Sequence, residues 1–184
     1  MAADGARSGP GAAGTPPGGF DRDFRASLTS RPAARLRPAQ LSQIVRATVL
    51  AEDSWRPVLR FAERRWFSRL VLTDDYEIWL LSWLPGQHTG FHDHGEACGA
   101  FGVAQGELRE TLAAPGRARL RHRAAGPGSV TRFGRQHVHD VANVAAAPAV
   151  SVHAYSPPLT AMRRYEMTPA GLTLAGTDQA ELDW

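Results

Sequence analysis

Apolar side chains recur at helical spacing in the first third of the chain. In the segment Pro38–Ala51 they lie three or four positions apart, as on one face of a helix: Leu41, Ile44, Val45 and Val49. The segment Trp55–Arg65, which begins beside Pro57, predicts a second, shorter helix. We therefore expect helices, punctuated by proline, over residues 20–65.

After Trp66 the pattern changes to short apolar runs separated by Gly, Pro and Asp turns. No helical pattern lies between them. The runs are Glu77–Leu84, Gly99–Ala104, Glu107–Leu112, Ala118–His122, Ser129–Phe133, His137–Val141 and Ala149–Tyr155. Many short strands at such spacing are typical of a β-sandwich or barrel. We predict a mainly β fold, with a barrel over residues 66–168 and the helices packed outside it.

The first 19 residues differ from the rest of the 184-residue chain. They are nearly all Ala, Gly, Pro and Ser, a composition that cannot form a packed core. We expect a disordered tail over residues 1–19 and a single domain over residues 20–184.

Composition excludes several classes of protein. All 21 basic residues are Arg, which rules out mechanisms that need a Lys, such as Schiff-base chemistry and the P-loop. Cys98 is the single cysteine, so intramolecular disulfides and thiolate zinc clusters are excluded. The charge of +3 is modest and no dense basic run occurs, so we expect no nucleic-acid partner. Without a long apolar stretch or a secretory signal, we expect a cytoplasmic protein with no membrane partner. We also expect a monomer.

Histidines cluster in two short segments. His92 and His94 lie two residues apart, so on a strand both side chains leave the same face. A second pair, His137 and His139, lies on a later predicted strand. Imidazole is a common ligand of zinc, copper, iron and nickel, and the two segments together predict a metal centre. The alternative interpretation is a set of hydrogen-bonded or surface histidines.

The residues around the first pair resemble the first cupin motif. Its spacing is reproduced by Gly86, His92, His94, Gly99 and Gly106. His139 and Asn143 are similar to the end of the second motif. Most cupins place a Glu ligand four or five residues after the second His, and here these positions are Cys98 and Gly99.

A cupin without this carboxylate is left with three neutral histidine ligands. Such ligands leave a divalent metal with its full charge and open positions for a thiolate, an amine and dioxygen. Fe(II) binds nitrogen ligands and activates dioxygen readily. The predicted cofactor is therefore Fe(II).

The whole pattern resembles the cysteine dioxygenase type I family, in its bacterial form, over about residues 60–165. The resemblance rests on four segments: residues 92–94, 105–108, 139–143 and 151–158. It implies a cupin-type β-barrel, or jelly roll. In the family a Ser, a His and a Tyr of the last segment form a hydrogen-bonded relay beside the iron, and these carry over to Ser151, His153 and Tyr155. Strand alternation also places these three on one face, although a polar face can simply be exposed to solvent.

Two assignments depend on family spacing. His137 and His139 have the same strand parity, so alternation cannot choose between them; the distance to Asn143 favours His139 as the third ligand. Family members that oxidise cysteine carry an Arg that holds the substrate carboxylate, and the matching residue is Arg69. Arg65 and Arg60 are the alternatives. Arg is suited to this role because its guanidinium binds a carboxylate through two parallel hydrogen bonds.

The resemblance implies a reaction. His92, His94 and His139 would hold Fe(II), and both atoms of O2 would be added to the thiol of L-cysteine, giving cysteine sulfinate. Tyr155 would hydrogen-bond the bound oxygen or the substrate, oriented by His153 and Ser151. The alternatives are a dioxygenase of another small thiol, such as 3-mercaptopropionate or cysteamine, and a non-catalytic metal-binding cupin.

Animal members of the family form a thioether between the active-site Tyr and a Cys five residues beyond the second ligand. That position here is Gly99, and Cys98 lies one residue short of it. On a continuing strand, one residue short means the opposite face. We therefore expect the Cys98 thiol to point away from Tyr155, and no crosslink to form.

Overall fold

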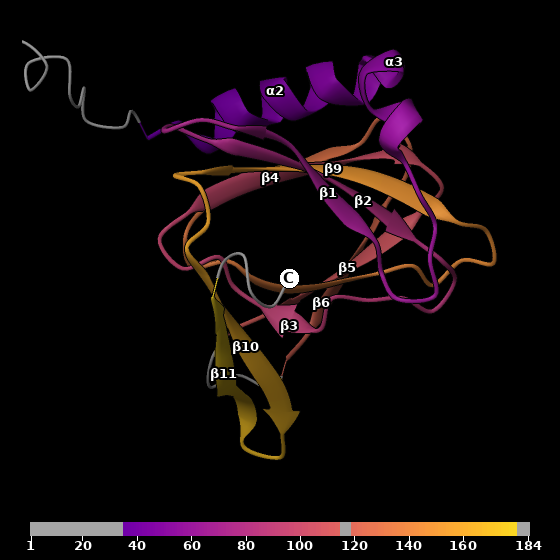
Figure 1. Cartoon of the computed structure of the whole chain (residues 1–184). Helices are drawn as coiled ribbons and strands as arrows, with labels where there is room; N and C mark the ends of the chain where they lie inside the picture. The colour runs from indigo at the N-terminus through magenta and orange to yellow at the C-terminus, as the bar shows by residue number, and fades with distance from the viewer. Residues whose placement is uncertain (1–34, 115–118, 180–184) are drawn as a thin grey trace, which may run out of the picture. The chain divides into compact units, whose positions relative to one another are not determined.

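The computed structural model describes residues 35–114 and 119–179, which belong to one compact unit (Figure 1). The tail expected over residues 1–19, and the expected helical region up to residue 34, lie outside the described residues.

Helices come first among the described residues. Helix α2 spans Pro38–Leu50, close to the predicted Pro38–Ala51. It is followed by the short α3 (Glu52–Trp55) and the 3-10 helix η1 (Arg56–Val58). Pro at the first helical position and a hydrogen bond from the Arg37 backbone to the Gln40 side chain (3.0 Å) begin α2 as expected for a helix N-terminus.

The predicted helix over Trp55–Arg65 is wrong. Pro57 has no N–H to donate to a preceding carbonyl, and the helical structure ends at Val58. Beyond it, the carbonyls of Ala62 and Glu63 accept hydrogen bonds from the side chain of Gln87 (2.9 and 2.8 Å). A distant side chain thus satisfies backbone groups that a helix would otherwise pair.

The rest of the described chain is β-structure. The strands are β1 (Phe67–Leu72), β2 (Glu77–Trp83), β3 (Phe91–His92), β4 (Cys98–Gln105), β5 (Leu108–Ala113), β6 (Arg121–Ala125), β7 (Val130–Phe133), β8 (Val138–Ala142), β9 (Ala149–Ser156), β10 (Ala161–Thr168) and β11 (Gly171–Gln179). Each of the seven predicted runs overlaps a strand. The strands β1, β3, β10 and β11 were not predicted, and β11 follows residue 168, where we expected the barrel to end.

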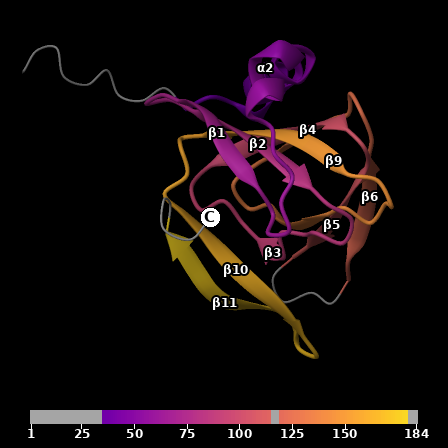
Figure 2. The ribbon, with the colours of Figure 1, turned by 45° about the vertical axis from the view of Figure 1, so that its right-hand side comes forward.

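The strands form two antiparallel sheets that face each other (Figures 1 and 2). One sheet has the order β1-β2-β9-β4-β7, and the other the order β11-β10-β3-β8-β5-β6. Strands that are distant in sequence are therefore neighbours, as β2 and β9 are. The prediction of a mainly β, cupin-type barrel with a helix outside it is confirmed.

Helix α2 covers the outer face of the five-stranded sheet (Figure 1). Its buried residues Leu41, Val45 and Val49 pack in an outer cluster that includes residues of β2, β4 and β9. Fully burying a Leu or Val side chain contributes roughly 1.5–3 kcal/mol. A Cβ at Gly102 of β4 would lie 2.8 Å from Val45 Cγ1, so this glycine allows the helix to approach the sheet closely.

Strand β9 is buried on both faces. Val150, Val152 and Ala154 belong to the outer cluster beneath α2. Tyr155 belongs to the inner cluster between the sheets, and Ser151 and His153 have the same parity. The polar face predicted for this strand is therefore turned into the barrel and not toward solvent.

Candidate metal centre

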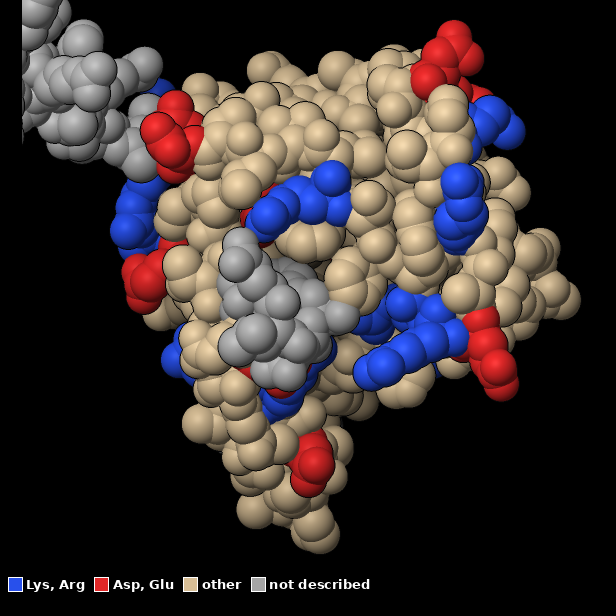
Figure 3. Space-filling model, viewed as in Figure 1, with Lys and Arg blue, Asp and Glu red and all other residues tan. Residues whose placement is uncertain are grey.

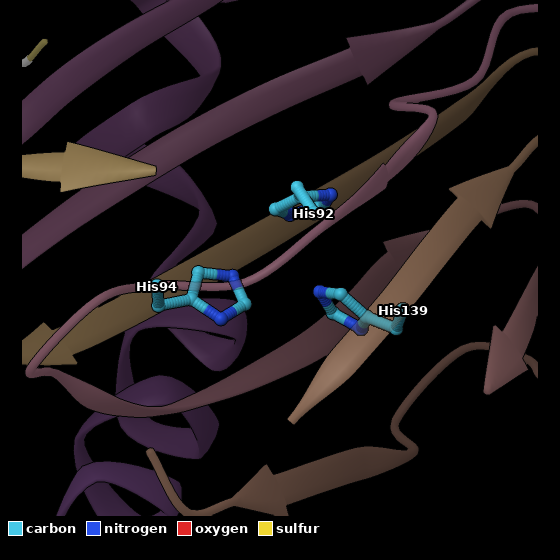
Figure 4. A group of neighbouring side chains, drawn as sticks. All are labelled: His92, His94 and His139. Atoms are coloured by element: carbon cyan, nitrogen blue, oxygen red, sulfur yellow. The ribbon is translucent and has the colours of Figure 1, made fainter. Parts of the chain in front are cut away.

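Three histidines meet inside the barrel (Figure 4). His92 ends β3 and is paired with His139 on β8, which places their rings side by side. His94 lies in the turn just after β3. The ring centroids are 4.7–5.1 Å apart, and one ligand atom from each ring lies within 4.8 Å of the others.

Hydrogen bonds fix which nitrogen each ring can offer to a metal. Nδ1 of His92 lies 2.9 Å from the carbonyl oxygen of Gly90, and Nδ1 of His139 lies 2.8 Å from a carboxylate oxygen of Glu110. A carbonyl or an ionised carboxylate only accepts, so in both rings Nδ1 carries the proton and Nε2 keeps a lone pair. This is the usual arrangement of a metal-binding histidine.

His94 is a buried ring without a hydrogen-bond partner. Neither of its nitrogens is hydrogen-bonded within the described part of the chain. The ring is stacked between Phe133 (centroids 4.8 Å apart) and Tyr155 (4.9 Å). Leaving a buried polar atom unpaired costs about 1–3 kcal/mol, and a metal ion between the three rings would give one of the two His94 nitrogens a partner.

Burial keeps the three rings neutral. It holds the pKa values of His92, His94 and His139 below the ordinary histidine value, and the neighbouring rings of the cluster lower those of His92 and His94 further. A neutral imidazole is the form that binds a metal. Three nitrogen donors without a carboxylate suit zinc, copper, nickel or iron better than calcium or magnesium. The residues therefore fit a transition-metal ion.

The structure groups His139, and not His137, with His92 and His94. Nε2 of His137 lies 2.7 Å from the same Glu110 oxygen that binds His139. His137 and His139 therefore point to the same side of β8, as their parity requires, but only His139 reaches the other two rings.

Asp93, between the two histidines of the first pair, was not singled out from the sequence. It is buried and accepts hydrogen bonds from Arg163 Nε (2.7 Å), the Tyr165 hydroxyl (2.8 Å) and the Gly95 backbone (3.0 Å). These contacts connect the short β3 segment to β10. Strand alternation, which directs Asp93 away from the face of His92 and His94, could have indicated that Asp93 has partners on the opposite face.

The predicted relay forms a continuous chain of hydrogen-bonding contacts. Ser151 Oγ lies 2.8 Å from His153 Nε2, and His153 Nδ1 lies 3.3 Å from the Tyr155 hydroxyl. Trp83 Nε1 donates to Ser151 Oγ (2.9 Å), a contact that the sequence did not reveal. Burial lowers the pKa of His153 to about 3. Burial, and then the charge of Glu77, raise the pKa of Tyr155 above its ordinary value, so the phenol keeps its proton.

A small cavity lies beside the histidines. His92, His139, His153 and Tyr155 line it, together with apolar side chains and Thr89. Two arginines complete the lining: Arg65, from the segment before β1, and Arg164 of β10, which the sheet register places opposite His92. The cavity is thus apolar over much of its wall and carries positive charge at one side.

Arg69, the predicted carboxylate-binding residue, is not among the residues that line this cavity. Its guanidinium lies 3.7 Å from the buried carboxylate of Glu77 and 5.3 Å from the ring centroid of Trp79, a residue of the cavity wall. Arg69 therefore lies beside Trp79 and outside the cavity lining, while Arg65 and Arg164 line the cavity.

Arg65 and Arg164 are close enough to influence each other. Burial lowers the pKa of Arg65, and the charge of Arg164 lowers it further. Arg65 donates to the carbonyl of His88 (2.8 Å) and Arg164 to that of Thr89 (3.2 Å). Nε of Arg65 is buried without a hydrogen-bond partner among the described residues. An anion in the cavity would relieve the repulsion between these two cations.

Comparison with known proteins agrees with this geometry. The sequence model of cysteine dioxygenase type I matches residues 38–168, which is more than half of the chain. The chain belongs to the cysteine dioxygenase type I family. Membership makes it a cupin-type thiol dioxygenase that depends on a non-haem metal and acts on a small thiol and O2. No curated protein matches the chain.

Comparison with solved structures finds similar chains at low sequence identity. TT1209 from Thermus thermophilus is 19% identical, with a TM-score of 0.50 over 56% of this chain and 93% of its own. A protein from Klebsiella pneumoniae with a double-stranded β-helix domain is 21% identical, with a TM-score of 0.47 over 65% and 92%. A cupin superfamily protein from Desulfitobacterium hafniense is 14% identical, with a TM-score of 0.45 over 53% and 82%.

Gly99 and Cys98, at and next to the position of the thioether cysteine in animal members of the family, have the predicted geometry. Gly99 is the residue of β4 that pairs with Tyr155, and Cys98 pairs with Ser156. The Cys98 thiol lies in the outer cluster, where it donates to the carbonyl of Leu36 (3.2 Å). A Cβ at Gly99 would lie 2.5 Å from the Phe133 ring, so this ring occupies the space that a side chain at residue 99 would need.

Two observations concern nucleic-acid and membrane partners. On the face drawn in Figure 3, acidic and basic side chains of the described residues are interspersed and do not form one broad basic area. Within residues 35–114 and 119–179, the helices are too short or too polar to cross a membrane.

Proposed function

We propose that this dioxygenase is an Fe(II)-dependent cysteine dioxygenase, which adds both atoms of O2 to the thiol of L-cysteine and forms cysteine sulfinate. The observation that carries the proposal is the set of three buried histidines without a carboxylate ligand. Two of them, His92 and His139, line a small cavity that two arginines also line. His92, His94 and His139 would hold the iron. Bound Fe(II) would supply the site at which thiolate and dioxygen meet and exchange electrons.

Tyr155 is the proposed catalytic residue of the protein itself. With Trp83 donating to Ser151 and Ser151 donating on to His153 Nε2, the remaining ring proton of His153 lies on Nδ1, facing the Tyr155 oxygen. The phenol proton is then free to point into the cavity, where it can bind the substrate or oxygen. Because the pKa of Tyr155 is raised, the hydroxyl acts as a hydrogen-bond donor and not as a phenolate.

The substrate carboxylate is proposed to bind to the arginine pair. Arg65 and Arg164 both line the cavity, and a carboxylate between two guanidinium groups forms charge-assisted hydrogen bonds with both. Arg69, the residue that the family pattern indicates, lies outside the cavity lining. Arg69 and Arg164 each have a carboxylate neighbour, Glu77 and Asp178, so it is the lining that favours Arg65 and Arg164. The pair favours thiols with a carboxylate, namely cysteine and 3-mercaptopropionate, over cysteamine, which has none.

The deciding experiment is oxygen uptake by anaerobically purified, Fe(II)-loaded protein with these three thiols. We expect about one iron per chain, and turnover fastest with L-cysteine, with cysteine sulfinate as the product. His92→Ala, His94→Ala and His139→Ala should each lose iron and activity. The matched His137→Ala removes a contact of Glu110 but no ligand, so it should keep more of both than any of these three variants. Full function with zinc in place of iron would contradict the dioxygenase proposal. Metal binding without oxygen uptake would favour the non-catalytic cupin.

Arginine variants test how the substrate is held. Arg65→Gln and Arg164→Gln should each raise the KM for cysteine about ten- to a hundred-fold, because a charge-assisted hydrogen bond contributes about 1.5–3 kcal/mol. Turnover of cysteamine should change much less. Arg69→Gln is the matched control, because Arg69 lies outside the cavity lining. If Arg69→Gln raised the KM more than the other two variants, Arg69 would be the residue that binds the substrate carboxylate, as the family pattern indicates.

A further inference from the structure

Glu110 of β5 is a fully buried carboxylate within hydrogen-bonding distance of a proposed metal ligand. One of its oxygens accepts hydrogen bonds from His139 Nδ1 (2.8 Å) and His137 Nε2 (2.7 Å). The other accepts from Arg123 Nε (2.9 Å), and Arg123 Nη2 also contacts it. Arg123 lies directly opposite Glu110 on the neighbouring strand β6, so the sheet register itself brings the two charges together.

These partners make the buried charge stable. A carboxylate in the interior without partners is costly by several kcal/mol. Three side chains offset this cost, because His137, His139 and Arg123 each direct a hydrogen bond at the carboxylate, and the Arg123 guanidinium also forms an ion pair with it. Paired in this way, Glu110 acts as the hydrogen-bond acceptor for both rings.

The three metal-binding rings differ in what supports them. A backbone carbonyl holds His92, no hydrogen bond within the described residues holds His94, and only His139 is held by a charged group. A carboxylate that accepts Nδ1–H fixes the ring orientation and makes the opposite nitrogen a stronger donor. Among the three rings, it is therefore the orientation of His139 that a charged side chain fixes.

We infer that Glu110 is a positioning residue for His139, and that His137 and Arg123 serve to hold Glu110 in place. The inference rests on the proposed iron site. It gives the second histidine pair a division of roles: His139 binds the metal, and His137 holds the carboxylate that orients it. His137 also stacks on Phe133 (centroids 4.7 Å, planes 13° apart), the ring that in turn stacks on His94.

Glu110, His137 and His139 also form a three-residue cluster of possible ligands, but hydrogen bonding explains it better than a second ion. The Arg123 guanidinium contacts the same carboxylate and would repel a cation there. The Nδ1 of His139 would also have to give up its proton.

The test compares Glu110→Gln with Glu107→Gln, the same change at an exposed residue just before β5. Fe(II) affinity is measured anaerobically by competition with a chelator, and Co(II) binding by its visible absorption spectrum. Removing such a carboxylate support typically weakens metal binding 10- to 100-fold. We expect that loss, with a changed Co(II) spectrum, in Glu110→Gln alone. If the single variant does not fold, Glu110→Gln combined with Arg123→Leu removes both charges and is measured in the same way.

The outcomes separate this inference from the proposed function. If Glu110→Gln binds both metals as tightly as Glu107→Gln, with an unchanged Co(II) spectrum, the positioning role is wrong while the iron site stands. If the unmodified protein does not bind Fe(II), or binds it without the three histidines, both the proposed function and this inference fail.

Discussion

The two faces of the five-stranded sheet are both buried, yet they carry opposite chemistry. The outer face is apolar and is covered by α2. The inner face carries Ser151, His153 and Tyr155 on β9, with Glu77 on β2. An apolar face contributes to stability by burial alone, whereas polar groups buried opposite a second sheet must find partners or cost free energy. Ser151, His153 and Tyr155 are connected by hydrogen bonds, and the last two line the cavity, so their presence is explained by chemistry and not by stability.

This contrast predicts that inner-face variants lose activity while outer-face variants lose stability. The largest effect is expected for Tyr155→Phe, which removes only the hydroxyl that points into the cavity. Turnover should fall roughly 10²- to 10³-fold, within the range for a lost proton-donating group, at nearly unchanged iron content and Tm. Tyr76→Phe, the same change in a residue packed against the outer cluster, should leave turnover intact. Equal losses in both variants would remove the distinction between the faces.

The second largest effect is expected beneath the helix. Leu41→Ala creates a cavity in the outer cluster and should lower the free energy of unfolding by about 2–3 kcal/mol, with a fall in Tm on the order of 5–10 °C. Activity per folded molecule should not change. Leu50→Ala is the control in the same helix, because Leu50 is 77% exposed. A kcat that fell in Leu41→Ala at temperatures well below its Tm would connect the outer face to the chemistry.

Acid should destabilise the protein because of His153 on the inner face. The pKa of His153 is about 3 in the folded state and about 6.5 in an unfolded chain. Below pH 6.5 the unfolded state therefore takes up a proton that the folded state does not, and stability falls as the pH drops toward 3. The expected contribution is up to about 1.4 kcal/mol per pH unit. Unfolding by denaturant between pH 7 and 5 measures it, and His153→Gln should reduce the slope by about one proton. An unchanged slope would mean that folding does not shift the titration of this ring.

The smallest effect is expected for Cys98→Ala, on the outer face. Its thiol makes one hydrogen bond, to Leu36, and the loss should be below about 1 kcal/mol, with activity retained. Mass analysis after turnover with cysteine should find no species lighter by two hydrogens. A Cys98–Tyr155 peptide would show that β4 can rearrange enough to turn the thiol inward.

Local pattern predicted those parts of the molecule that depend on neighbours in sequence. Alternation placed Ser151, His153 and Tyr155 on one strand face. The expectation that His92 and His94 share a strand was only partly right, because β3 ends at His92, although both rings reach the same site. The helical spacing of Leu41 and its neighbours predicted α2. These features need only the geometry of one element, which the sequence pattern records.

The remaining features depend on contacts between distant segments. The orientations of His139 and His137 depend on their contacts with Glu110, which lies 29 and 27 positions away in the sequence. Arg164 faces the cavity because β10 pairs with β3, and β10 was not predicted, since its apolar positions are few and irregular. Strand β3 has only two residues, too few for a pattern. Sequence alone could not place these side chains, because sheet register between distant strands is set in the assembled fold.

Gly99 and Phe133 together constrain how this enzyme can change over evolution. A cysteine at residue 99 would collide with the Phe133 ring, which stacks on both His94 and His137. Acquiring the thioether of the animal enzymes would therefore disturb a metal ligand unless residue 133 became smaller first. We therefore expect the effect of a substitution at residue 99 to depend on residue 133, and a lineage that carries the large ring at 133 to keep glycine at 99.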